Sequence, residues 1–177
     1  MKTAVHVPQD LVADEKQSWL QGQRVSIATT AGRDCILGAS VAQSASPTDL
    51  KQAYGNFAQE AQALDEDDAP QTVNTEGWQA TQGAWKALFP NITVLLCFLH
   101  AFLKIRDRAK KALGAIFEQV QERVWEAYHA PSTRTFSQRL RRLLEWAEAA
   151  LPASALKTHT LDLCDKRAPC SRSYDHL

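Results

Sequence analysis

The order of strand and helix signals constrains the fold of this chain more than any other feature of its sequence. Three segments rich in β-branched and apolar residues come first, with turn residues and no helical pattern between them. They are residues 11–16, 24–30 and 35–41. A helical pattern then begins at Ser46-Pro47, where a candidate N-cap residue is followed by a proline suited to the first helical turn.

Beyond this helix, strands and helices alternate, and then helices alone continue. In chain order the segments are a strand at 71–75, a helix at 78–88, a buried strand at 92–96, helical sequence from 97 to about 129, and helices at 137–150 and 152–164. Three consecutive strands followed by alternating helices and strands are the plan of a ribonuclease-H-like mixed sheet. We therefore predict an α/β fold: a partial ribonuclease-H-like core (residues 1–96), an all-helical insertion (97–164) and an irregular tail (165–177).

The charges of the chain are balanced in number but unevenly distributed. The sequence holds 20 basic and 20 acidic residues, so net charge neither supports nor excludes a nucleic-acid partner. Residues 45–76 contain seven acids and one base, whereas residues 101–142 contain ten bases and four acids. Five of these bases crowd one stretch: Lys104, Arg106, Arg108, Lys110 and Lys111. Such a stripe attracts phosphate backbones, although a solvated helix face has the same appearance.

The sequence shows no secretory or membrane-spanning signal. No apolar segment of the required length follows Lys2, and the apolar run at 92–103 is too short to cross a bilayer. The four cysteines, Cys35, Cys97, Cys164 and Cys170, have no paired CxxC spacing. We therefore expect reduced thiols, a cytoplasmic location and no membrane partner.

Two acidic residues occupy positions that suit metal binding if the sheet has the predicted order. Asp14 lies in the first strand, and Glu76 directly follows the fourth. These strands are neighbours in such a sheet, so the two carboxylates can face each other. Paired carboxylates bind divalent metal ions, which two-metal phosphoryl transfer requires. Ordinary surface acids at strand ends would show the same pattern.

Cys97 and His100 place a thiol and an imidazole on one helix face, three residues apart. A structural zinc site would need two more ligands, for which His129 and Cys164 are the candidates. A buried thiol and a hydrogen-bonded histidine are the alternative.

Two segments carry a resemblance to a known protein family. The stretch from Val73-Asn74-Thr75-Glu76-Gly77-Trp78 to Pro90, and Cys97-Phe98-Leu99-His100 continuing to Arg108, resemble bacterial insertion-sequence transposases of the DDE class. The Cys-x-x-His is also similar to that of the mutator-like and related groups. Asp14-Glu15-Lys16 and the hairpin after it are similar to the strand that carries the first catalytic aspartate of the family, and the resemblance extends over residues 11–177.

This resemblance implies metal-dependent DNA cleavage and strand transfer. It implies Asp14 and Glu76 as catalytic residues that hold Mg²⁺ or Mn²⁺, with transposon-end DNA and further subunits of the same protein as partners. Glu76 departs from the aspartate usual at its position, and its extra methylene displaces the carboxylate. The third acid of the family follows the helical insertion, and this chain ends before a matching acid. We therefore expect a truncated transposase that is inactive alone, with a non-catalytic DNA-binding or transposase-binding remnant as the alternative.

Overall fold

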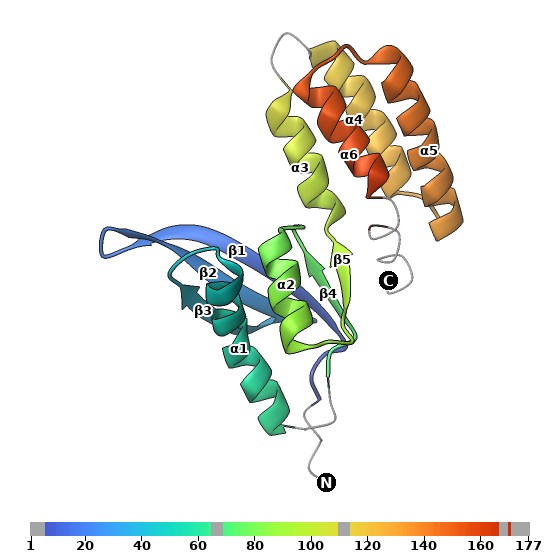
Figure 1. The fold of residues 1–177 in the computed structure, drawn as a ribbon. Helices are drawn as coiled ribbons and strands as arrows, with labels where there is room; N and C mark the ends of the chain where they lie inside the picture. The colour runs from blue at the N-terminus through green and yellow to red at the C-terminus, as the bar shows by residue number, and fades with distance from the viewer. Residues whose placement is uncertain (1–5, 65–68, 110–113, 167–169, 171–177) are drawn as a thin grey trace. The chain divides into compact units, whose positions relative to one another are not determined.

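The computed structural model of this protein describes residues 6–64, 69–109, 114–166 and 170. The chain divides into two compact units, Met1–Leu95 and Leu96–Leu177. The first unit contains a sheet and two helices, and the second is helical (Figure 1). None of the helices in the described ranges combines the length and apolar character that crossing a bilayer requires.

The first unit is built on a five-stranded mixed sheet. In chain order its strands are β1 (Asp10–Leu20), β2 (Gln23–Gly32), β3 (Cys35–Ala42), β4 (Thr72–Thr75) and β5 (Thr93–Leu96). Their order in space is β3-β2-β1-β4-β5, with β2 antiparallel to both β1 and β3 and with β4 parallel to β1. This arrangement confirms the predicted ribonuclease-H-like sheet, in which the first and fourth strands are neighbours.

The connection between β1 and β2 is a tight turn whose residues explain the hairpin. Gln21 and Gly22 both have positive φ values, 51° and 79°. Two consecutive residues in this region form the type of two-residue turn whose twist matches that of antiparallel strands. Ser18, Trp19 and Leu20 then pair with Val25, Arg24 and Gln23, so the long hairpin extends directly from the turn.

Two helices, α1 (Pro47–Leu64) and α2 (Gln79–Leu88), pack on one face of the sheet (Figure 1). Ser46 caps α1 as predicted, since its hydroxyl accepts a hydrogen bond from the backbone N–H of Asp49 at 3.1 Å. Burial alternates along β1 because successive side chains point to opposite faces. We call the face that packs against α1 and α2 the covered face, and the face that carries Val12, Asp14 and Lys16 the open face.

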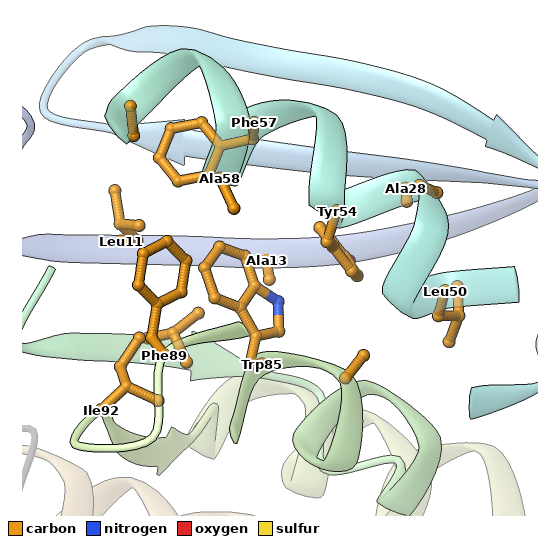
Figure 2. Close-up of a cluster of buried hydrophobic side chains, with 14 of the residues drawn as sticks. Leu11, Ala13, Ala28, Leu50, Tyr54, Phe57, Ala58, Trp85, Phe89 and Ile92 are labelled. Carbon is orange, nitrogen blue, oxygen red and sulfur yellow. The ribbon is translucent and has the colours of Figure 1, made fainter. Parts of the chain in front are cut away.

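Aromatic rings fill the space between the covered face and the two helices. The ring of Trp85 is fully buried and lies 5.0 Å from that of Tyr54, 6.0 Å from Phe57 and 5.7 Å from Phe89, between centroids. Figure 2 shows these side chains over Leu11 and Ala13 of β1. This core holds α1 and α2 against the strand that carries Asp14.

The second unit has its own apolar core. Its helices are α3 (Phe98–Arg108), α4 (Gly114–Tyr128), α5 (Thr133–Ala150) and α6 (Ala155–Asp165). Each contributes buried side chains at helical spacing, among them Phe102, Val124, Leu140 and Leu156. Ser132 and Ser154 cap α5 and α6 by accepting hydrogen bonds from the backbone N–H groups of Thr135 and Lys157.

The helical part differs from the prediction at two places. The expected continuous helical sequence from 97 to 129 is divided, because α3 ends at Arg108 and Ala109 is extended, with ψ 111°. The division lets the ring of Phe102 pack 5.0 Å from that of Trp125, whereas the rise of a straight helix would hold them about 35 Å apart. Helix α5 begins at Thr133 rather than 137, since Ser132 supplies the cap. Lys110, Lys111 and most of the expected tail lie outside the described residues.

Candidate metal site

Asp14 lies within β1, the central strand of the sheet, on its open face. Its strand neighbours Val12 and Lys16 are exposed like Asp14 itself, whereas Ala13 and Glu15 are buried on the covered face. Asp14 stands opposite Thr29 of β2. A carboxylate on this face is accessible to a cation from solvent.

Glu76 follows β4 at a position that corresponds to Asp14 on the neighbouring strand. The parallel pairing of β1 with β4 aligns Val12 with Asn74 and Ala13 with Thr75, and the next residues are Asp14 and Glu76. Gly77 then turns the chain toward α2 with φ 92°, a conformation that favours glycine.

Hydrogen bonds fix the turn that follows Glu76. Thr75 Oγ1 accepts from the backbone N–H of Gly77 at 3.2 Å, and Gln82 Nε2 donates to the Gly77 carbonyl at 3.1 Å. The backbone around half-buried Glu76 is therefore held from both β4 and α2.

Glu15 is an acid that the sequence analysis did not single out, and the structure buries it beneath Asp14. Only 7% of Glu15 is exposed, and its Oε1 accepts hydrogen bonds from the hydroxyls of Tyr54 at 2.5 Å and Thr81 at 2.8 Å. Among the described residues, Oε2 has no hydrogen-bond partner. The burial of Glu15 follows from the alternation of side chains along a strand: Leu11, Ala13 and Glu15 are two residues apart, so they point to the same face of β1.

The surroundings of Glu15 shift two pKa values. Burial raises the pKa of Glu15, the charge of Asp14 adds to this effect, and hydrogen bonding from Tyr54, Thr81 and Glu76 acts in the opposite direction. Burial also raises the pKa of the Tyr54 hydroxyl, and the neighbouring Glu15 charge raises it further. Asp14 and Glu76 are thus both close enough to Glu15 to influence its protonation.

These acids suit a divalent cation in chemistry, although the described residues form no ready-made group of three ligands for a metal ion. Asp14 and Glu15 point to opposite faces of β1. The strand pairing places Glu76 next in line beside Asp14, and the Glu76 side chain also hydrogen-bonds Glu15. Asn74 shares the open face, and its Oδ1 is buried without a hydrogen-bond partner in the described part of the chain. Carboxylate and amide oxygens are hard donors that fit Mg²⁺ or Mn²⁺.

The basic residues predicted to contact DNA lie on α3 where the structure describes them. Lys104, Arg106 and Arg108 are exposed. Arg106 forms an exposed ion pair with Asp107 at 2.9 Å, which leaves less of its charge available to a phosphate. A role of α3 in DNA binding stays a prediction.

The candidate zinc ligands have other surroundings. The ring of His129 stacks on Trp125 with centroids 5.9 Å apart, and Cys164 is buried in the helical core. No group of three metal ligands includes them within the described ranges.

No known protein-family model matches the chain, and curated protein sequences give no match either. The solved structures similar to it include the integrase catalytic core domain of HTLV-2 in complex with magnesium, with 11% identity over 89% of this chain and 84% of that chain and a TM-score of 0.35. They also include a simian T-cell lymphotropic virus intasome in complex with the PP2A regulatory subunit B56 gamma. That match has 12% identity over 89% of this chain and 56% of that chain, with a TM-score of 0.38. Neither similarity bears on the activity, ligands or partners of this protein.

Proposed function

We propose that this chain is part of a DNA transposase in which Asp14 and Glu76 hold a divalent metal ion, Mg²⁺ or Mn²⁺. The observation that carries the proposal is the parallel pairing of Ala13 with Thr75, because the residues that follow this pair are the two acids. The resemblance of the sequence around Glu76 and Cys97 to DDE-class transposases supports the same function.

The residues of the chain would have distinct tasks at this site. Asp14 would provide a ligand from the open face, and Glu76 would provide another from the end of β4. Glu15, bonded to Tyr54 of α1 and Thr81 of α2, ties the backbone beneath Asp14 to both helices. When bound, the metal ion would supply charge stabilisation for phosphoryl transfer.

Two carboxylates leave most of the coordination shell of the metal to water. Magnesium requires six oxygen ligands in a nearly octahedral arrangement, and a longer glutamate side chain at position 76 fixes its oxygen less closely than aspartate would. We therefore propose that this chain alone binds metal weakly and does not carry out strand transfer.

Binding of Mn²⁺, followed by electron paramagnetic resonance, tests the proposal. Asp14→Asn and Glu76→Gln should each weaken binding about tenfold or more, because each removes a charged ligand. Glu60→Gln, a change at an exposed acid of α1, is the matched control and should leave the affinity unchanged. Wild-type affinity in Asp14→Asn would overturn the proposed site.

The non-catalytic alternative has its own signature in the same variants. Binding of DNA that is independent of metal and unaffected by Asp14→Asn, together with no Mn²⁺ binding by the wild type, would favour a DNA-binding remnant.

A further inference from the structure

A second candidate site lies in the helical unit, between α4 and α5. It is a pocket of about 340 Å³, and three of its six lining residues are arginines while one is an acid. The lining residues are Arg123 and Glu126 from α4, and Arg139, Arg142, Leu143 and Trp146 from α5. Nothing in the proposed metal site involves these residues, and they are separate from the basic residues of α3.

The helices themselves bring these side chains together. Arg139, Arg142 and Trp146 follow one another at spacings of three and four residues, which places them on one face of α5. The guanidinium of Arg123 lies 4.5 Å from the centre of the Trp146 ring, a cation–π contact that joins α4 to α5. A nitrogen of Arg139 donates to the backbone carbonyl of Glu126. Two of the three guanidiniums are therefore held in place by contacts across the helix pair.

The positive charge of this pocket is not neutralised by ion pairs. In the part of the chain that the structure describes, no carboxylate forms an ion pair with Arg123, Arg139 or Arg142. The Nε of Arg123 is buried and has no hydrogen-bond acceptor there. Arginine stays protonated, so these donors cannot lose their charge, and a buried donor without an acceptor is costly. A bound anion would satisfy them.

The neighbouring Arg141 shows the contrast. Its side chain is 73% exposed and pairs with Glu145 at 3.1 Å, one turn along the same helix. Arg141 therefore behaves as an ordinary surface cation, whereas the arginines of the pocket converge without a carboxylate partner.

We propose that this pocket binds a phosphate group of a DNA backbone; the identity of the polymer rests on the proposed function. The guanidinium groups that line the pocket come from two helices, Arg123 from α4 and Arg139 and Arg142 from α5, so they approach it from two sides. The oxygens around a tetrahedral phosphorus can accept from both directions, whereas the two oxygens of a carboxylate and their lone pairs lie in one plane. The geometry thus favours phosphate over the acidic side chains of a protein partner.

The test is the salt dependence of DNA binding by the full chain, measured by fluorescence anisotropy of a labelled duplex in the presence of EDTA. The variant Arg139→Gln/Arg142→Gln removes two guanidiniums but keeps the packing of Arg123 on Trp146. We expect its affinity at low salt to fall about tenfold, and the slope of log K against log salt to decrease in magnitude by roughly 0.9, the value for one phosphate contact. Arg141→Gln is the matched control and should change the affinity less than about twofold.

A double variant with wild-type DNA affinity and wild-type salt slope would overturn the proposed phosphate site. An equal loss of DNA affinity in Arg141→Gln would also overturn it, because it would indicate a general effect of positive charge. Circular dichroism of all three proteins shows whether they are equally folded. A titration of the wild type with inorganic phosphate, read from the arginine Nε–H signals by NMR, separates the sources of phosphate. Binding of phosphate but not of duplex would overturn the assignment to DNA.

The outcome is independent of the metal site, since EDTA removes divalent cations throughout. Loss of DNA binding in the pocket variant supports the phosphate site even if Asp14 binds no Mn²⁺. Conversely, Mn²⁺ binding that depends on Asp14, combined with unchanged DNA binding in the double variant, leaves the proposed function intact and refutes the pocket.

Discussion

Replacing Tyr54 with phenylalanine removes a single hydroxyl from the core and keeps the rest of the ring. The ring is 1% exposed and lies 5.0 Å from Trp85, contacts that phenylalanine retains. The lost hydroxyl donates to Glu15 Oε1 at 2.5 Å, on a side chain that is only 7% exposed. The measured change in stability is therefore dominated by the buried hydrogen bond to the Glu15 carboxyl group, with a smaller part from the longer contact of the same hydroxyl with the backbone carbonyl of Asp14 at 3.4 Å.

The size of this change should depend on pH. A hydrogen bond to a neutral group contributes about 0.5–1.5 kcal/mol, and one to a charged group about 1.5–3 kcal/mol. Burial raises the pKa of Glu15 in the folded protein above its value in the unfolded chain. The stability that Glu15 contributes by binding a proton is therefore fully present below its unfolded-state pKa, and it is lost as the pH rises through its folded-state pKa. The Tyr54 hydroxyl lowers that pKa, so Tyr54→Phe raises it further and makes the loss at high pH larger. We expect destabilisation of about 1 kcal/mol near pH 4 and about 2 kcal/mol near pH 9.

Urea denaturation across this pH range measures the effect, followed by the ¹⁹F signal of fluorotryptophan at Trp85 so that the first unit is observed. Thr81→Val, which removes the other donor to the same oxygen, should show the same dependence and should not be additive with Tyr54→Phe. Tyr128→Phe, at a residue that is 43% exposed, is the control and should change stability by less than about 0.5 kcal/mol. Destabilisation that is equal at both ends of the range, or larger in acid, would refute the role given to Glu15.

Three further predictions concern other parts of the chain. Glu76→Asp alone should not produce strand transfer, assayed by the joining of labelled transposon-end DNA to a target; turnover in this variant would contradict the proposal that two acids are too few. Trp85→Ala should lower the free energy of unfolding by about 3–5 kcal/mol in urea denaturation, since the indole is fully buried, and a loss below about 1 kcal/mol would show that the core closes around the gap. Iodoacetamide at pH 8 should label exposed Cys35 well before Cys170, because burial raises the pKa of the Cys170 thiol to about 11. Equal labelling rates by peptide mass spectrometry would contradict the burial of Cys170.

The sheet could be predicted from the sequence because each strand is marked by a short local pattern of residues and the order of these patterns along the chain limits the pairing. Three strand segments in succession, with Gly22 and Gly32 near the turns, leave few ways to pair, and the neighbouring position of β1 and β4 follows from that order. The start of α1 was equally readable, since Ser46 is a cap that acts on a residue three positions away.

The remaining features depend on contacts between distant segments. The sequence Asp14-Glu15 offers two adjacent acids, and which of them is buried depends on Tyr54 and Thr81, which are 39 and 66 residues from Glu15. The arginine pocket was missed for the same reason, because Arg123 and Arg139 belong to different helices whose pairing no local pattern specifies. The break after Arg108 has no proline to announce it, and only the packing of α3 on α4 requires it.

The adjacency of Asp14 and Glu15 on opposite faces has a consequence for how this protein tolerates mutation. A substitution at position 14 removes a candidate ligand without disturbing the core, whereas position 15 accepts only side chains that satisfy the hydroxyls of Tyr54 and Thr81. Selection for abundance of folded protein would thus retain Glu15 while leaving Asp14 free to vary, and selection for metal binding would retain both. In gene copies that are not selected for metal binding, we expect Asp14 to be replaced earlier than Glu15. Insertion or deletion of one residue in β1 would satisfy neither selection, since it exchanges the two faces at once.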